Sequence, residues 1–174
     1  MFKKELNLSI VMQMENMHAW EGFLEKIKKD LLSYYGEALY AAVLFGSAAR
    51  GDFRKGSDLD LLVILRESED SMGKRIDEFM KMEWEYVCLK AQGLPHRIEP
   101  VILDLEEFRK HPPLLLDLTS DAEVLIDRDN VFANEMDLLR RRLQELGAKK
   151  VILEGGRWYW ILKPGIKWGE KVVL

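Results

Sequence analysis

Two apolar segments that enclose a polar loop are the most constraining feature of the sequence. They lie between residues 44 and 65, in LFGSAARGDFRKGSDLDLLVIL. The first segment ends at Gly46-Ser47, and ten residues further on Asp58 and Asp60 open the second. Carboxylates at the mouth of a buried strand are costly unless another group compensates their charge. The segment therefore predicts two buried strands and a charged site where they meet.

The spacing of the two aspartates indicates which group compensates their negative charge. Asp58 and Asp60 are two residues apart on a strand, so both side chains leave the same face. Two such carboxylates repel each other, and one would take up a proton unless a cation lay between them. Oxygen-only ligands favour Mg²⁺ or Mn²⁺, and Mg²⁺ usually completes its shell with water and substrate phosphates. The pair therefore predicts a metal site and a phosphorylated substrate.

Gly46 and Ser47 are suited to the phosphates of that substrate. Glycine lets the backbone approach a ligand closely, and backbone amides together with a hydroxyl can bind phosphate oxygens. Arg50 follows in the same expected turn and could add a cationic contact. The loop GDFRKGS superficially resembles a P-loop, but it has Gly56-Ser57 where that motif requires Gly-Lys.

Composition favours a cytoplasmic protein with one substantial domain. The chain has 174 residues, of which 48% are apolar and 32% charged. No apolar run approaches the ~18 residues of a membrane span, so we expect no membrane partner. The single cysteine, Cys88, excludes an internal disulfide. Residues 140–174 hold nine Lys or Arg against three Glu, which makes this tail net +6 and the rest of the chain −10.

Periodicity and turn residues predict the order of elements. We expect helices over 14–35, 71–92 and 129–146, capped at Ser71 and Asp129, strands over 38–45, 59–65 and 96–103, a short strand at 122–126, and a hairpin within 149–163 that turns at Gly155-Gly156. Pro100 favours an edge position for the third strand. We divide the chain into an N-terminal helix (1–35), a catalytic core (36–110) and a small α+β C-terminal extension (111–174).

Gly46-Ser47, ten residues and Asp58-x-Asp60 together resemble the signature of the DNA polymerase β superfamily of nucleotidyltransferases. The similarity is greatest to its small, minimal prokaryotic members and covers about residues 36–103. It implies an α/β fold, a mixed sheet with helices on one side. It also implies that Gly46 and Ser47 bind the nucleotide triphosphate and that Asp58 and Asp60 bind the metals. We add Arg50 and Ser57 as further candidate contacts to the nucleotide.

The resemblance also implies a third carboxylate on a later strand beside the pair. Glu99 stands at that position, as a third metal ligand and candidate catalytic base. Aspartate is usual there, so Glu99 departs from the family pattern. Asp104 is the alternative, although it lies at the end of its strand and alternates to the opposite face.

The function that these features favour is metal-dependent transfer of a nucleoside monophosphate to an acceptor hydroxyl, with release of pyrophosphate. We expect Mg²⁺ or Mn²⁺ as cofactor and ATP as the nucleotide. The acceptor stays open between a small molecule, a protein and RNA, and so does homo-oligomerisation. The alternatives are a catalytically silent, antitoxin-like nucleotide-binding module and, less favoured, a glycosyltransferase with a D-x-D metal site.

Tryptophans in the basic tail have two interpretations. On a hairpin, alternate aromatic residues usually cover a core, and we favour this for Trp158 and Trp160. With basic residues interleaved, they could instead stack on the bases of a nucleic-acid acceptor.

Overall fold

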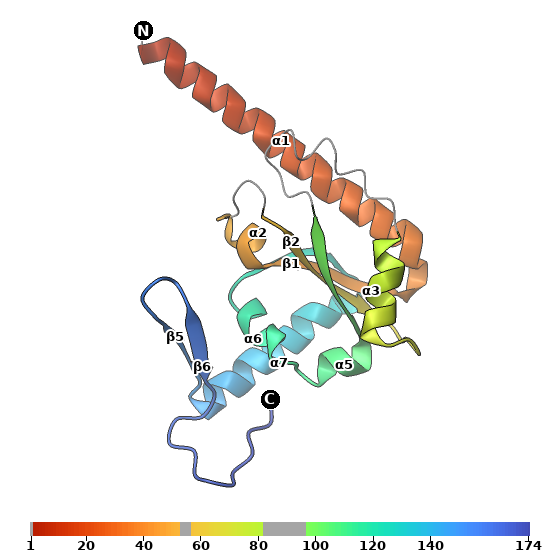
Figure 1. Ribbon diagram of the computed structural model, residues 1–174, viewed down its shortest axis with the longest axis vertical. Helices are drawn as coiled ribbons and strands as arrows, with labels where there is room; N and C mark the ends of the chain where they lie inside the picture. The colour runs from red at the N-terminus through yellow and green to blue at the C-terminus, as the bar shows by residue number, and fades with distance from the viewer. Residues whose placement is uncertain (1, 53–56, 82–96) are drawn as a thin grey trace.

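The computed structural model describes residues 2–52, 57–81 and 97–174, with side chains from His18 onward. Figure 1 shows the arrangement of its elements. In chain order these are α1 (Phe2–Tyr35), β1 (Leu39–Phe45), α2 (Gly46–Arg50), β2 (Leu59–Leu65), α3 (Met72–Met80), β3 (Ile98–Asp104), α5 (Leu105–Arg109), α6 (Leu114–Leu118), β4 (Ala122–Asp127), α7 (Val131–Leu146), β5 (Lys149–Ile152) and β6 (Trp158–Ile161). Short 3₁₀ turns precede β1 and α7.

The central sheet is mixed and has the strand order β3-β2-β1-β4. β1 runs antiparallel to both β2 and β4, whereas β2 and β3 are parallel. Proline cannot donate a ladder hydrogen bond, which is consistent with Pro100 on the edge strand β3. The expected α/β fold with a mixed sheet flanked by helices is thus confirmed.

Helices cover both faces of this sheet, which differs from the one-sided arrangement that the family resemblance implied. Along β2, Leu61 and Val63 pack towards α1 and α3, while Leu62 and Ile64 pack towards α5, α6 and α7. Successive side chains of a strand point to opposite faces, so a strand that is apolar at every position requires a cover on each. The helices that follow β3, from α5 to α7, supply the second cover.

Most expected elements are present, with three differences. The first helix begins at Phe2 rather than near residue 14. The second is capped by Ser71 as expected but ends at Met80, with Lys81 as its C-cap. The expected continuation from residue 82 lies outside the described residues together with Cys88. The cap expected at Asp129 is wrong, because the Asp127 carboxylate accepts hydrogen bonds from the backbone amides of Phe132 and Ala133 in the first turn of α7.

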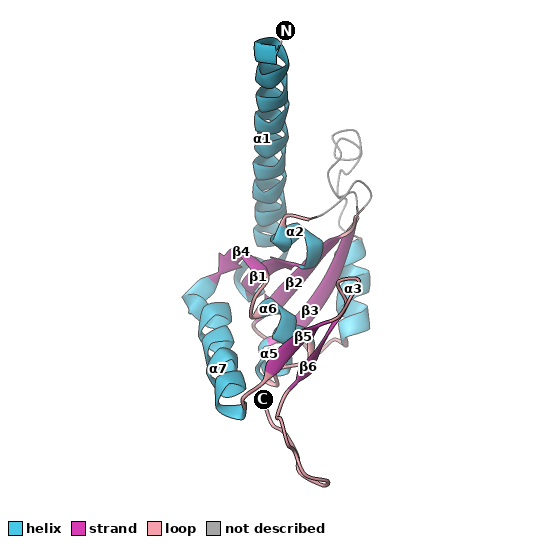
Figure 2. Ribbon diagram, turned by 90° about the vertical axis from the view of Figure 1, so that its left-hand side faces the viewer, coloured by secondary structure: helices cyan, strands magenta, loops and turns pink. Residues whose placement is uncertain are grey.

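The segment after residue 111 completes the fold in two ways. β4, which the sequence analysis placed in the C-terminal extension, pairs with β1 in the central sheet. β5 and β6 form a separate antiparallel hairpin that turns through Gly155 and Gly156, both with positive φ angles. Figure 2 shows this hairpin beside α6, on the same side of the molecule as α2. Among the described residues, no helix combines the length and apolar character that crossing a membrane requires.

Candidate active site

The register of β2 and β3 brings the predicted carboxylates together. Glu99 pairs directly with Asp60 across the two parallel strands. Asp58 precedes Asp60 by two residues, so its side chain leaves the strand on the same side. That side is the one on which Leu62 packs towards α6 and α7. Three carboxylates therefore gather at the N-terminal ends of β2 and β3.

Gly46 lies directly against this cluster. Its φ angle of +67° is in the left-handed region, where residues with a side chain are strained. A Cβ atom at this position would overlap Oδ2 of Asp60 and lie 3.0 Å from its Cγ. The glycine is thus required twice, by its backbone conformation and by the close approach of the carboxylate. Ser47 is the second residue of α2. The N-cap position of this helix is occupied by Phe45, which makes no side-chain cap, so Ser47 is not the capping residue.

Within the cluster, the pKa of Asp60 is shifted from its ordinary value. Burial raises the pKa of its carboxyl above the ordinary value of 3.8, and the charges of Asp58 and Glu99 raise it further. The guanidinium of Arg50 acts in the opposite direction and lowers the pKa. The site consequently favours either a proton or a cation at Asp60.

This raised pKa predicts how stability depends on pH. Between the ordinary pKa and the raised pKa, folded Asp60 binds more protons than the unfolded chain, so the free energy of unfolding falls as the pH rises. Replacing Asp60 by Asn removes this pH-dependent loss of stability. We expect Asp60→Asn to be more stable than the parent protein at neutral pH, with the difference shrinking towards acid pH. Urea denaturation of both proteins over a pH series measures it, and a variant less stable at neutral pH would contradict the assignment.

A cavity of about 330 Å³ opens beside these residues. One wall comes from β1, α2 and β2, the other from α6, β6 and the residue that precedes β4. The lining residues are Phe45, Gly46, Ser47, Arg50, Asp60, Leu114, Asp117, Leu118, Asp121 and Trp158. Four of the residues predicted for the site thus share one cavity of a size typical of small-molecule pockets. Ser57 and Asp58 immediately precede β2 and are half-buried.

Sequence reasoning missed the second wall of this cavity. Asp117 and Asp121 lie in a segment without a recognisable motif, and Trp158 was expected to cover a core. Trp160 does pack against the core, whereas Trp158 is 42% exposed and faces the cavity. The alternation of aromatic residues indicated a hairpin but not which of its side chains would remain accessible.

Glu99 and Asp104, the two candidates for the third carboxylate, lie far apart in the structure. Glu99 lies next to Asp60, although its Oε1 is 2.6 Å from Nη2 of Arg97 in an exposed ion pair. Asp104 pairs with Leu65 at the other end of the same strands, where it caps α5 and lies 3.5 Å from the buried Arg75. At ~3.3 Å per residue, five residues of strand place Asp104 about 16 Å from Glu99. Asp104 therefore cannot complete the cluster.

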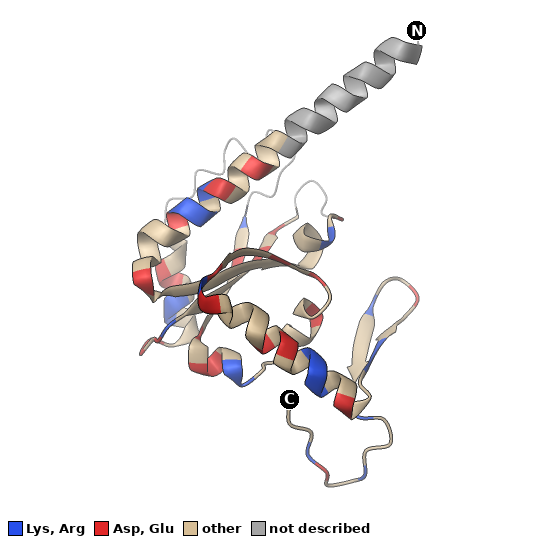
Figure 3. Ribbon diagram, turned by 180° about the vertical axis from the view of Figure 1, so that it is seen from behind, with Lys and Arg blue, Asp and Glu red and all other residues tan. Residues whose placement is uncertain are grey.

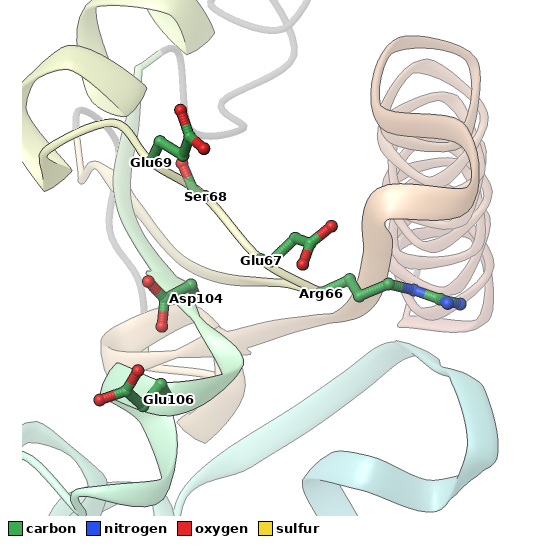
Figure 4. Close-up of a pocket in the computed structure, with 6 residues that line it drawn as sticks. All are labelled: Arg66, Glu67, Ser68, Glu69, Asp104 and Glu106. Atoms are coloured by element: carbon green, nitrogen blue, oxygen red, sulfur yellow. The ribbon is translucent and has the colours of Figure 1, made fainter.

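A second hollow, of about 530 Å³, lies at that far end of the sheet. Figure 4 shows its lining, which consists of Arg66, Glu67, Ser68, Glu69, Asp104 and Glu106. None of the residues predicted to bind phosphate lines this hollow, whereas Gly46, Ser47, Arg50 and Asp60 line the smaller one. The smaller cavity beside Gly46 is therefore the candidate active site.

The donor set fits a hard divalent cation only in part. Asp58 and Asp60 offer carboxylate oxygens on one face, and burial together with the charges of Asp58 and Glu99 raises the pKa of Asp60. Within the described residues, no three His, Cys, Asp or Glu side chains are already arranged to hold a metal ion together. A two-carboxylate site suits Mg²⁺ when substrate phosphates and water complete its coordination. The residues present therefore fit such an ion together with a triphosphate.

A mixed sheet with Gly-Ser beside paired carboxylates defines a nucleotidyltransferase. Residues 24–116, more than half of the chain, match the nucleotidyltransferase domain family. The chain belongs to this family. The predicted membership of the polymerase β superfamily and the predicted enzyme class are thereby confirmed, with the acceptor unknown.

Two proteins of Methanocaldococcus jannaschii are related in sequence. "Putative protein adenylyltransferase MJ1305" is 29% identical over 119 residues, which cover 68% of this chain and 76% of that protein. "Putative protein adenylyltransferase MJ0141" is 39% identical over 44 residues, which cover 25% of this chain and 44% of that protein. Both alignments support the nucleotidyltransferase assignment.

Solved structures with some likeness come from toxin–antitoxin systems. A toxin–antitoxin structure with AMP-PNP has a TM-score of 0.42 at 19% identity, covering 70% of this chain and 90% of that one. A structure of the toxin–antitoxin MntA–HepT has a TM-score of 0.40 at 17% identity, covering 72% and 90%.

Gly46 offers a direct test of the geometry. Gly46→Ala introduces a Cβ in the left-handed region and against Asp60, so we expect a loss of about 1–3 kcal/mol in stability together with weakened nucleotide binding. Gly51→Ala is the matched control, because Gly51 has a φ angle of +72° but nothing within 4 Å of its added Cβ. Urea denaturation and calorimetry compare the two. If Gly51→Ala impaired nucleotide binding as much as Gly46→Ala, backbone strain alone would explain the result.

Proposed function

We propose that this protein is a metal-dependent nucleotidyltransferase that transfers AMP from ATP to a hydroxyl group of another protein. The observation that carries the proposal is the pairing of Asp60 with Glu99, beside Asp58 and against Gly46. It provides a negatively charged cluster next to a backbone that a polyphosphate can approach. ATP and a protein acceptor are supported by the two relatives that carry the name of protein adenylyltransferases.

Each residue of the cluster has a distinct role in this proposal. Asp58 and Asp60 would hold Mg²⁺ or Mn²⁺, which when bound neutralises the triphosphate and polarises its α-phosphorus for in-line attack. Gly46 lets the phosphates approach the backbone, and the Ser47 hydroxyl and the Arg50 guanidinium can donate hydrogen bonds to phosphate oxygens. Ser57, which immediately precedes the aspartate pair, is the fourth proposed nucleotide contact.

Glu99 is the proposed base. It lies beside Asp60, where an acceptor hydroxyl would approach the α-phosphorus, and it can accept the proton of that hydroxyl. For this the carboxylate must leave the ion pair with Arg97. Such a rearrangement is inexpensive, since exposed ion pairs contribute only ~0–1 kcal/mol.

The test is transfer of the labelled α-phosphate of ATP. The protein is incubated with α-labelled ATP, Mg²⁺ or Mn²⁺ and a cell extract that supplies acceptors, and pyrophosphate is assayed in parallel. We expect label on a protein band and stoichiometric pyrophosphate, both dependent on the metal. ATP binding with no pyrophosphate release under any condition would support the silent-module alternative. Label on RNA or a small molecule would correct the acceptor and leave the transfer intact.

A further inference from the structure

The β5–β6 hairpin places a large aromatic side chain in the wall of the nucleotide cavity. Trp158, the first residue of β6, lines the cavity opposite Gly46 and Ser47. It remains 42% exposed although it is one of the largest apolar side chains of the hairpin. An accessible tryptophan that faces a small-molecule cavity offers a stacking surface.

Hydrogen bonds hold this indole in place. Nε1 of Trp158 donates to Oδ1 of Asp117 at 2.8 Å, and Nε1 of Trp160 donates to the same oxygen at 3.1 Å. Nζ of Lys150 lies 3.4 Å from that oxygen and 3.6 Å from Oδ2 of Asp121. The single positive charge of the lysine offsets one of the two carboxylates, and its Nζ also lies 4.9 Å from the centre of the Trp158 ring. The ring edge of Trp158 is fixed before any ligand binds.

Arg50 connects this ring to the phosphate-binding side of the cavity. Its Cζ lies 6.0 Å from the centre of the Trp158 ring, and Arg50 acts electrostatically on Asp60. A cation–π contact at an exposed position is weak, whereas a hydrogen bond from a guanidinium to a phosphate is among the strong ones. A bound triphosphate can therefore draw Arg50 away from the indole. The ring lies next to the residue that contacts phosphates, where the nucleoside of the same ligand has to extend.

We propose that Trp158 is the platform on which the base of the bound nucleoside triphosphate stacks. The β5–β6 hairpin then forms one wall of the nucleotide site, and Asp117 is the residue that positions the platform. This inference rests on the proposed function, because it presumes that the triphosphate lies at Gly46 and Asp60. Every base offers a π face, so the platform adds affinity for nucleotides with little choice among bases.

Titration calorimetry with two ligands tests this assignment separately from the site itself. ATP carries a base, whereas inorganic tripolyphosphate offers only the phosphates. In the presence of Mg²⁺ we expect the parent protein to bind both, and ATP more tightly. Trp158→Ala should weaken ATP binding by roughly 5- to 150-fold, the range expected for the loss of one stacked base, and leave tripolyphosphate binding unchanged. Trp158→Phe, which keeps an aromatic face, should retain most of the affinity for ATP.

Tyr159→Ala is the matched control. Tyr159 is an exposed aromatic residue of the same strand, but its side chain points to the opposite face of the hairpin. The Tyr159→Ala variant should bind ATP and tripolyphosphate with the same affinities as the parent protein. Unchanged tripolyphosphate binding also shows that Trp158→Ala is folded.

Three results would overturn the inference. If Trp158→Ala weakened the binding of ATP and of tripolyphosphate equally, Trp158 would act on the phosphates and not on the base. If the parent protein bound ATP and tripolyphosphate equally well, the base would make no productive contact. Both results leave the proposed site standing. If the parent protein bound neither ligand, the proposed function would fail together with the inference.

Discussion

Replacing both Asp58 and Asp60 by asparagine should reduce nucleotide transfer by about 10³-fold or more and abolish Mg²⁺-dependent triphosphate binding. Each carboxylate supplies negative oxygen ligands, and a metal ion contributes several kcal/mol of charge stabilisation when phosphoryl groups react. Amide oxygens carry no net charge and hold Mg²⁺ weakly. Calorimetry with ATP and Mg²⁺ measures binding, and pyrophosphate release measures transfer.

The expected loss must come from ligands and not from damage to the fold. Removal of mutually repelling carboxylates relieves strain in the metal-free protein, so the double variant should be as stable as the parent protein or slightly more stable. The matched control is the double variant Glu67→Gln and Glu69→Gln, which removes two carboxylates from the acidic hollow at the far end of the sheet. It should transfer like the parent protein. ATP affinity that persisted in the aspartate variant would exclude the site.

The aspartate pair could be predicted from the sequence because its parts are local. Asp58 and Asp60 share a face by the two-residue period of a strand, whereas Glu99 was placed beside them only by the family resemblance. The left-handed conformation at Gly46 agrees with a glycine between a strand and a turn. The chain also alternates between short apolar segments and helical patterns, which predicts an α/β fold.

The second wall of the cavity could not be predicted, because it depends on contacts between distant segments. Trp158 meets Asp117 across 41 residues of sequence. Which face of the hairpin stays open depends on how β6 is placed against α6, and alternation along a strand carries no such information. The cap of α7 was missed for a similar reason. Asp127 belongs to β4, and its carboxylate reaches the helix only because the chain turns through 3₁₀ geometry between them.

Tertiary structure also determines how much of the positive charge of residues 140–174 is free to attract a partner. A net charge of +6 over residues 140–174 suggested a surface for an anionic partner. Figure 3 shows basic and acidic segments interspersed along α7 and the hairpin. Lys150 lies within 3.6 Å of carboxylate oxygens of Asp117 and Asp121, and Lys163 lies 2.9 Å from Glu170. Part of the basic excess is thus paired within the molecule.

Glu99→Gln should reduce transfer by about 10²-fold or more while nucleotide binding stays close to that of the parent protein. Glutamine has nearly the same shape as glutamate but cannot accept a proton, so a loss confined to transfer identifies Glu99 as the base. The structure excludes the competing candidate, because Asp104 lies at the far end of β3 and is engaged with α5 and Arg75. Pyrophosphate release at saturating ATP measures the effect.

Arg97→Gln separates this role from a structural one. Arg97 and Glu99 form an ion pair at 2.6 Å, and either substitution breaks it. If the pair mattered only for the structure of the strand, the two variants would lose transfer to the same extent. If Glu99 is the base, Arg97→Gln keeps the carboxylate and should transfer at least as well as the parent protein, because the carboxylate no longer has to leave an ion pair before it accepts the proton. Unchanged transfer in Glu99→Gln would leave Asp58 and Asp60 as the only essential carboxylates and would indicate that the acceptor loses its proton without a protein base.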